Sequence, residues 1–528
     1  MKHRITILIL LIAGVIFAAC NSEREQPETP PVPPVITMTV EAVKGGADAS
    51  TRALKESTDA TTGKKTVDAY WTEGEMVRVV QTNSAGKGEV IGTLQATASD
   101  NGRTKLTGIL TKLPEETKPL TFYLHNADQD YTAQTGTLAD ISTNHDFVWG
   151  VVPAGSFTNN TMKKTVTVTG NVVNMNQVGQ AIVKFTLTDK ADGTTPVAVR
   201  KLTISEANGR ILTKKDIATQ TPVTGNLEIT PSTTGNVLWV SMAPYDSHYA
   251  TAADVPLDLT LTAETDNGDI YTYTKSGVHL TANRYYAITV KMEKLAIGNL
   301  YYSDGTWSQT LIPAKPPIGV VAYVGNDVFS EKGVTLRDGK TTLKSHGLVL
   351  CLKNAGSSVV WSSITGKAYQ PYAYVDATEA LKRTEGVSGY TVTKALASSN
   401  YPACQTAWNY TSLAAPPNTT GWFLPSEQQW VKIVCGLGGL SESAVEYSTY
   451  IAGDAIINQI ENALKKAGNG AYDLLRAGDT NWYWSSSEFD DEYATGISIF
   501  EEDGLNLRFV GTPKNDSEST YVRPVLAF

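Results

Sequence analysis

The chain has 528 residues, which at roughly 150 residues per domain predicts three or four domains. Lys and Arg number 44 and Asp and Glu 53, so the formal net charge is −9. This balance lacks the basic surplus typical of nucleic-acid-binding proteins and argues against such a partner. The 43 Gly and 24 Tyr favour strands and turns, and the four Cys are too few for a disulfide-dense scaffold.

The first residues have the pattern of an export signal. Lys2 and Arg4 precede an apolar run over residues 5–17, which is about the length of a signal-peptide core. A stable membrane-spanning helix needs a longer apolar run. We therefore predict a signal over residues 1–20 and an exported protein.

The end of this run, Ala18-Ala19-Cys20, resembles the lipobox of bacterial lipoproteins. The resemblance implies that Cys20 carries lipid, palmitate included, and anchors the precursor in the outer membrane at the cell surface. An ordinary secretory peptide cleaved near Ala19 is the alternative. Residues 21–34 are polar and Pro-rich, which predicts an extended tether.

The segment after the tether alternates apolar and polar residues, as a strand with one buried face does. Its sequence over residues 35–43 is VITMTVEAV. The predicted buried face consists of Ile36, Met38, Val40 and Ala42.

Short alternating segments with frequent turn signals continue from Tyr70 to about Met292. The strongest turn dipeptides are Asn101-Gly102, Asp192-Gly193, Asn208-Gly209 and Asn267-Gly268. No amphipathic helix is evident here. The region is long enough for two successive β-sandwiches, which we place at residues 35–175 and 176–296.

Beyond this region the pattern changes. Pro313, Pro316 and Pro317 predict a linker over residues 297–317. Helical periodicity follows at Asp454–Ala467, and Pro425-Ser426-Glu427 is typical of a helix start. We predict an α+β domain over residues 318–528.

Several motifs in the first two-thirds resemble the fimbrillin family, the pilus subunits of Gram-negative anaerobes. They follow the lipobox and the first strand in the order of that family. The motifs are Arg52-Ala53, Trp71-Thr72-Glu73-Gly74-Glu75, Tyr131 to Leu138, Gln180 to Phe185, and Asn283-Arg284-Tyr285-Tyr286. The resemblance implies two tandem transthyretin-like β-sandwiches in a mainly β protein.

The last third resembles a C-type-lectin-like domain found at the end of secreted and pilus-associated proteins. Three segments carry this resemblance: Gly421 to Ser426, Tyr483 to Glu488, and Tyr521 to Phe528.

The fimbrillin resemblance implies an assembly mechanism. An arginine-specific protease would cut between Arg52 and Ala53, which releases the first strand and opens an apolar groove. An extended segment of another fimbrillin subunit would then fill the groove by strand addition. Alternatively, Arg52 is an ordinary surface arginine in a loop.

The lectin-like domain takes the place where stalk fimbrillins carry a donor segment, so we expect a tip adhesin that binds a host or bacterial surface glycan or protein. One alternative is a monomeric surface lipoprotein that captures glycans. A pilus anchor subunit, which would keep its first strand and its lipid, is the other alternative.

Residues with chemical potential are scattered. The six His show no metal-binding spacing, and no nucleophile or phosphate-loop motif is present, so we expect no enzyme activity and no catalytic residue. Cys404 and Cys435 could be imagined as an oxidase pair, but their surroundings do not match. With Cys20 lipidated, Cys351 and these two can form at most one disulfide within the chain.

Two patches in the last domain could bind a ligand. Trp482 and Tyr483 belong to an aromatic group in which Trp422 and Trp484 are expected to be core residues. The acidic residues Glu488, Asp490, Asp491 and Glu492, with the run Glu501-Glu502-Asp503, could hold Ca²⁺, although solvated acidic loops are the simpler interpretation. No other cofactor and no resident metal site is expected.

Overall fold

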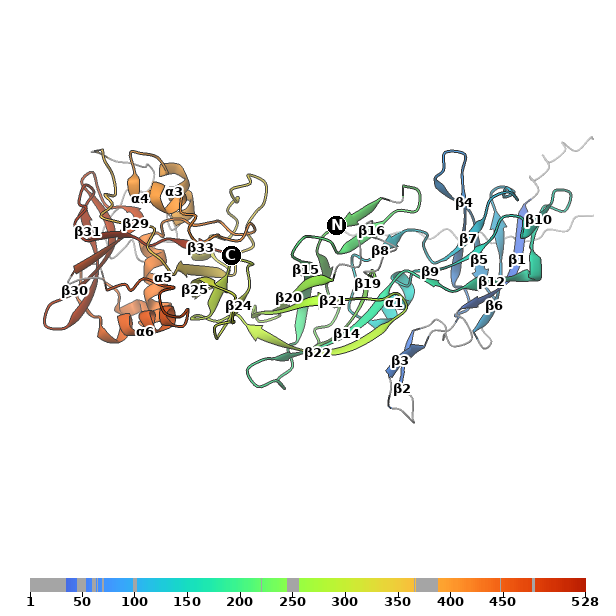
Figure 1. Cartoon of the computed structure of the whole chain (residues 1–528), viewed down its shortest axis with the longest axis horizontal. Helices are drawn as coiled ribbons and strands as arrows, with labels where there is room; N and C mark the ends of the chain where they lie inside the picture. Colours follow the sequence, from blue (N-terminus) through green and yellow to red (C-terminus); the bar gives the residue numbers. More distant parts are fainter. Residues whose placement is uncertain are drawn as a thin grey trace, which may run out of the picture.

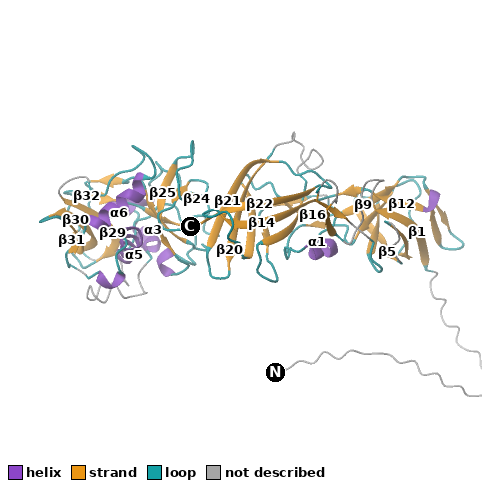
Figure 2. Cartoon of the chain, turned by 90° about the horizontal axis from the view of Figure 1, so that it is seen from below, coloured by secondary structure: helices purple, strands orange, loops and turns teal. Residues whose placement is uncertain are grey.

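The computed structural model arranges the chain as three bodies in a row, with the N-terminal body at one end and the helix-containing body at the other (Figure 1). Strands dominate the first two bodies and helices gather in the third (Figure 2), which confirms the mainly β class. The structure describes residues 35–44, 54–58, 63, 65–68, 71–97, 102–219, 221–244, 256–364, 366, 388–446, 448–476 and 480–528. The predicted signal and tether, Cys20, Arg52 and Ala53 lie outside these residues.

The first domain is one strongly curved sheet around an apolar core. Its strand order is β10-β11-β1-β6-β5-β4-β7-β9-β13, and β12 pairs with β1 while also lying against β9, so the sheet curls back on itself. The strands are β1 (Ile36–Lys44), β4 (Met76–Thr82), β5 (Gly88–Ala96), β6 (Arg103–Leu110), β7 (Leu120–Leu124), β9 (Val148–Val152), β10 (Phe157–Asn160), β11 (Thr165–Val168), β12 (Val172–Met175) and β13 (Gln177–Val178).

The second domain is a curved seven-stranded sheet in the order β18-β15-β20-β21-β22-β14-β19, beside a small sheet in the order β17-β16-β8. The large sheet contains β14 (Ala181–Asp189), β15 (Val199–Glu206), β18 (Leu227–Ile229), β19 (Val237–Met242), β20 (Leu257–Thr265), β21 (Ile270–Val278) and β22 (Tyr285–Lys294). The small sheet contains β8 (Gln129–Asp130), β16 (Leu212–Lys215) and β17 (Pro222–Thr224).

The boundary between the two sandwiches is less simple than the predicted division at residue 175. Residues 129–147, with β8 and the helix α1 (Leu138–Asn144), lie on the second domain, where Tyr131 and Phe147 join its core. The Tyr131 hydroxyl donates to the Gly179 carbonyl at 2.5 Å. The first domain's chain therefore makes an excursion into the second core.

The hairpin of β2 (Lys55–Thr58) and β3 (Lys65–Asp68) also lies against the second domain. Its Glu56 carboxylate accepts hydrogen bonds from Lys184 Nζ at 2.5 Å and from the Tyr285 hydroxyl at 2.6 Å. The chain on either side of residues 45–53 is thus attached to different domains.

The third domain combines two sheets with four described helices. The sheets have the orders β24-β23-β25-β26-β33 and β27-β32-β29-β30-β31-β28. The helices are α3 (Gly389–Leu396), α4 (Pro402–Trp408), α5 (Glu427–Gly438) and α6 (Asp454–Lys465). The strands are β23 (Leu300–Tyr302), β24 (Trp307–Ser308), β25 (Pro317–Val324), β26 (Gly347–Cys351), β27 (Gly356–Ser357), β28 (Ile451–Ala452), β29 (Thr480–Glu488), β30 (Tyr493–Glu501), β31 (Leu505–Pro513), β32 (Thr520–Val522) and β33 (Val525–Ala527).

The predicted linker over residues 297–317 is wrong. Its strands β23 and β24 belong to the five-stranded sheet, and Leu300 and Tyr302 are fully buried in the third domain's core. The three Pro residues that suggested a linker lie in and beside the turn that leads from β24 into β25. The second and third domains are consequently joined by packed structure.

Candidate functional site

The strand β1 lies inside the first sheet. It pairs antiparallel with β6 from Ile36↔Leu110 to Val43↔Arg103. On its other side it pairs parallel with β11 near its start and with β12 from Glu41↔Val172 to Lys44↔Met175. Both backbone edges of β1 are therefore used, and its loss would leave two unpaired edges facing each other.

The predicted alternation of β1 is confirmed. Met38, Val40 and Ala42 are at most 1% exposed and belong to the first domain's core, while Thr37, Thr39 and Glu41 are exposed. Ile36 is half-buried at the edge of the core. Without β1, the slot between β6 and its parallel partners would be lined by apolar side chains.

The C-terminal end of β1 is held by a buried charge. Lys44 Nζ lies 2.6 Å from the Glu75 carboxylate and 3.6 Å from the centre of the Trp71 ring. The Lys44 side chain is only 2% exposed, so its charge depends on this carboxylate and this aromatic face. The sequence motif at residues 71–75 pointed to this region, but Lys44 was missed because a Lys at the end of a strand carries no distinctive signal.

Two regions that flank the expected cleavage position are anchored separately. Lys44 is anchored in the first domain by its ion pair with Glu75. The Leu54 amide instead donates to Ser142 Oγ at 3.3 Å, and Glu56 binds the second domain. Residues 45–53, with the predicted Arg52 and Ala53, lie between them and outside the described residues. A cut in this connection would leave β1 held only by its pairing and packing in the first sheet.

The aromatic group of the third domain divides into core and surface. Trp422 and Trp484 are buried, as expected. Tyr483 was predicted to contact a ligand, but it is 1% exposed and its hydroxyl donates to the Leu475 carbonyl at 3.0 Å. Its position on β29 turns it towards the core, because side chains on a strand alternate between faces. Trp482, its neighbour, is half-buried.

The Trp482 side chain belongs to a patch that the sequence did not predict. The Arg508 guanidinium lies between 5.1 and 5.7 Å from the ring centres of Trp482, Tyr450 and Phe500. Tyr450 is 57% exposed. Three aromatic faces and a cation at the surface suit a planar or polar ligand. No local sequence pattern marks this patch, because its residues come together only through the pairing of β29 with β30 and of β28 and β30 with β31.

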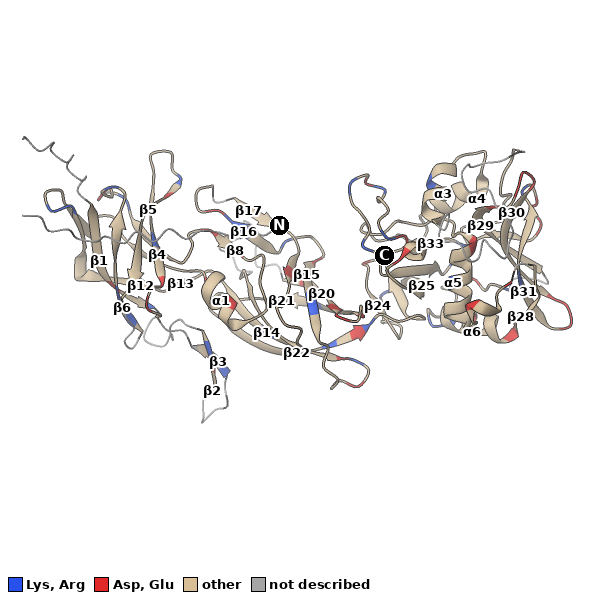
Figure 3. Cartoon of the chain, turned by 180° about the vertical axis from the view of Figure 1, so that it is seen from behind, with Lys and Arg blue, Asp and Glu red and all other residues tan. Residues whose placement is uncertain are grey.

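Two of the acidic side chains considered for Ca²⁺, those of Glu488 and Asp490, are engaged by the protein itself. Glu488 is paired with Lys514, whose Nζ also donates to the Asp491 carbonyl at 3.1 Å. The Asp490 carboxylate accepts the backbone amides of Glu492 and Tyr493 at 2.8 and 2.7 Å. Further acidic residues, red in Figure 3, lie at the ends of β30 and β31. In the part of the chain that the structure describes, no group of three His, Cys, Asp or Glu side chains could hold a metal ion.

The cysteines are poor nucleophiles. Cys351, Cys404 and Cys435 are free thiols, so none forms the disulfide that the sequence allowed. Burial raises the pKa of Cys351 and of Cys435 to about 11, and that of Cys404 to about 12. Thiols with raised pKa carry almost no thiolate at neutral pH, which argues against the oxidase chemistry considered for Cys404 and Cys435.

None of the described helices is both long and apolar enough to cross a membrane. No protein-family model matches the chain, and no curated protein matches it.

Among solved structures, the chain resembles a candidate cell adhesion protein from Bacteroides fragilis NCTC 9343, with 15% identity, a TM-score of 0.25, and coverage of 53% of this chain and 100% of that one. It also resembles a candidate adhesin from Bacteroides ovatus, with 11% identity, a TM-score of 0.24, and coverage of 52% and 91%. A shaft pilin from Lactobacillus rhamnosus GG matches with 12% identity, a TM-score of 0.21, and coverage of 48% and 97%.

Proposed function

We propose that the chain is an exported subunit of a surface fibre, joined to its neighbour by exchange of a β-strand. The observation that carries this proposal is the position of β1, an interior strand whose apolar face fills a slot between β6 and β11/β12. Cleavage after Arg52 would disconnect β1 from the rest of the chain. A neighbouring subunit's extended segment would then take its place.

The physical driving force is the cost of an open slot. Fully burying a Val or Met side chain contributes roughly 1.5–3 kcal/mol, and each unpaired backbone group on the slot's edges adds to the penalty of leaving it empty. A donor segment with the same alternation as Met38, Val40 and Ala42 would restore both contributions. Loss of β1 therefore favours association with another chain.

In this proposal, the subunit lies at the tip of the fibre. The strand β33 pairs with β26, and the Phe528 side chain is 6% exposed against Tyr301 and Trp307, so this segment is committed to its own domain. The third domain would carry the adhesive function. Its surface patch of Trp482, Tyr450, Phe500 and Arg508 would meet a glycan or protein of the target surface.

The test is the mature N-terminus of the chain extracted from the cell surface. Cleavage predicts a start at Ala53 and co-purification with other fibre subunits. An Arg52→Lys variant keeps the charge but removes the arginine cleavage position. Its chain should keep β1 and should not be incorporated into the fibre. A wild-type chain that begins at Cys20 and bears lipid, with no form starting at Ala53, would contradict the proposal.

The aromatic patch supports a second candidate, a monomeric lipoprotein that captures glycans. This candidate needs no strand exchange. It predicts that the purified chain with β1 in place binds soluble polysaccharide without other subunits, and that Trp482→Ala weakens this binding.

A further inference from the structure

The sheet of the second domain opens between two neighbouring strands. β21 and β22 pair only at one end, at Tyr271↔Lys294 and Thr272↔Glu293. Beyond these pairs, β21 stays on β20 and β22 stays on β14. No described strand pairs with the facing edges over residues 273–278 and 285–292.

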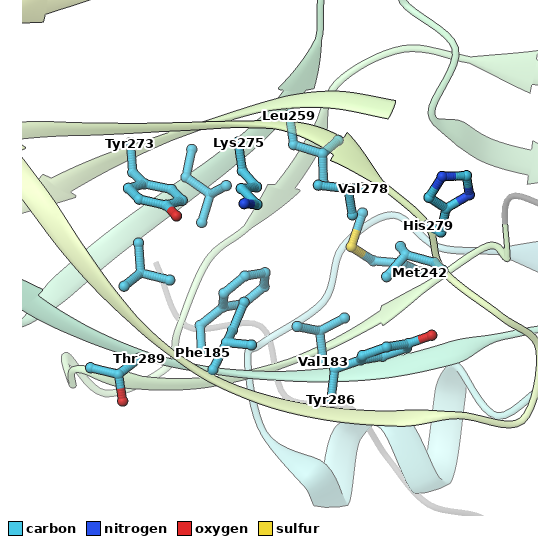
Figure 4. A pocket seen from close by; sticks show the side chains of 14 residues that line it. Val183, Phe185, Met242, Leu259, Tyr273, Lys275, Val278, His279, Tyr286 and Thr289 are labelled. Carbon is cyan, nitrogen blue, oxygen red and sulfur yellow. The ribbon is translucent and has the colours of Figure 1, made fainter. Parts of the chain in front are cut away.

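A cavity of about 310 Å³ lies in this opening. Figure 4 shows Tyr273 and Lys275 on one side of the cavity and Val183, Phe185, Tyr286 and Thr289 on the other. The floor is apolar and buried, because Val183, Phe185 and Met242 are each at most 3% exposed. The wall residue Ile288 is nevertheless 41% exposed, which shows that the inner face of β22 loses its cover here.

The first domain shows a strand lying between two antiparallel strands, although β21 and β22 differ from that pair in being consecutive and joined by residues 279–284. There β1 lies antiparallel to β6 and parallel to β11, so the two flanking strands run antiparallel to each other. The strands β21 and β22 are also antiparallel, so any strand between them would be parallel to one and antiparallel to the other. At roughly 3.3 Å per residue, about six residues would fill the open length.

The rim of the opening is basic. Lys275 is exposed and, among the described residues, forms no ion pair, and His279 lines the same cavity beyond Val278 (Figure 4). An occupant with a carboxylate at this end would complement the Lys275 charge. The open edges, the apolar floor and the basic rim together specify an extended peptide more closely than they specify a compact ligand.

We propose that the groove between β21 and β22 is a second strand-acceptor site, which binds an extended segment of another protein chain with apolar residues at alternating positions and an acidic residue near Lys275. The site goes beyond the exchange of β1, because it is in a different domain and is open while β1 is in place.

The test uses the full chain with β1 in place and a synthetic peptide of residues 35–44 (VITMTVEAVK), the strand whose pairing this protein already shows. Binding is followed by fluorescence anisotropy and by amide hydrogen exchange. The peptide should bind saturably and slow exchange at residues 273–278 and 285–292, with β6 unchanged. A peptide with Ser in place of Met38, Val40 and Ala42 should not bind.

A matched pair of variants locates the site. Ile288→Glu places a charge in the groove and should weaken binding roughly tenfold or more. Val237→Glu is the control, since Val237 is 40% exposed in the same domain and does not line the groove.

A second pair of variants tests the charge of the groove. Lys275→Glu should weaken binding of a peptide that has a carboxylate near Lys275, and Lys291→Glu should not.

The proposal is overturned if the peptide does not bind, if it binds without slowing exchange at both edges, or if Ile288→Glu and Val237→Glu act alike. Oleate that occupies the cavity while the peptide fails to compete would identify an acyl-chain pocket instead. Because β1 remains in place, each of these results leaves the exchange of β1 to its own test.

Discussion

Glu427 begins the helix α5 with its carboxyl group inside the protein. The residue is 1% exposed, and its Oε1 has no hydrogen-bond partner among the described residues. A helix N-terminus favours a carboxylate by roughly 0.3–1 kcal/mol, but desolvation is the larger effect. Burial raises the pKa of Glu427 to about 8.

The raised pKa of Glu427 predicts that the third domain is more stable at pH 5 than at pH 8. The folded chain keeps a proton that the unfolded chain releases near pH 4.5, so stability is lost as pH rises from about 4.5 through about 8. Glu331, with a pKa raised to about 7 by burial, adds to the same slope. Thermal melting should show a shallower pH dependence in Glu427→Gln, and an unchanged slope would contradict this assignment.

Lys514 supplies the cation that the nearby acidic residues need. Its side chain is 4% exposed and that of its partner Glu488 is 11% exposed, so the pair is largely buried. We expect Lys514→Ala to lower the free energy of unfolding by about 3–5 kcal/mol, because an unpaired carboxylate would remain.

A calcium chelator should leave the melting temperature and ligand binding of the wild-type chain unchanged. A chelator-induced drop in either would establish a metal site.

Among the elements, β1 is the strand that the first domain's core needs and that a cut after Arg52 would separate from the rest of the chain. Its position between β6 and β11/β12 makes it part of the core, and the buried Lys44–Glu75 pair fixes one end. Truncation of Met38 would show how much the packing of β1 contributes to the stability of the first domain.

In the chain that keeps β1, Met38→Ala should destabilise the first domain by about 2–5 kcal/mol, the usual cost of truncating a large core residue. Thr39→Ala, on the exposed face of the same strand, should change stability by no more than about 0.5 kcal/mol. Chemical denaturation measures both. Equal effects of the two substitutions would show that the apolar face does not hold β1.

Elements with a strong local pattern could be predicted from the sequence. The period-2 alternation placed β1, the Pro-Ser-Glu start placed α5, and the apolar spacing placed α6. Long-range features could not. Residues 129–147 join the second core, where β8 pairs with the distant β16, and Leu300 and Tyr302 pack into a core built from much later segments. No local window of sequence contains these partners.

The candidate site shows the same division. The apolar face of β1 was visible in the sequence, but its anchor Lys44 depends on Trp71 and Glu75 from a later segment. Tyr483 was named as a candidate ligand contact because its aromatic neighbours suggested a patch, whereas the alternation of β29 turns its side chain towards the core. Arg508 was missed because its aromatic partners come from three separate segments.

At the scale of the whole molecule, the second and third domains share an apolar junction. Ile270 and Leu295 from the second domain join Tyr301, Trp307 and Phe528 in one buried cluster. The Trp307 indole also donates to the Glu293 carbonyl at 3.3 Å. We infer that these two domains move together; in a subunit at the tip of a fibre, as proposed above, this coupling would transmit force from the third domain to the second.

Trp307→Ala should cost about 3–5 kcal/mol and separate the unfolding of the second domain from that of the third. Calorimetry should then resolve two transitions where the wild type shows one for this pair. Leu311→Ala, at a residue that is 43% exposed, serves as the control. A single unchanged transition in Trp307→Ala would show that the junction does not couple the domains.

Strand exchange is tested by replacing β1 with a strand added in trans. A chain that begins at Ala53 is mixed with the peptide of residues 35–44, and amide hydrogen exchange is measured at β6, β11 and β12. We expect fast exchange at these strands without the peptide and strong protection with it, together with a recovered melting temperature of the first domain. Protection that is already complete without the peptide, or that the peptide fails to restore, would contradict strand exchange as the basis of assembly.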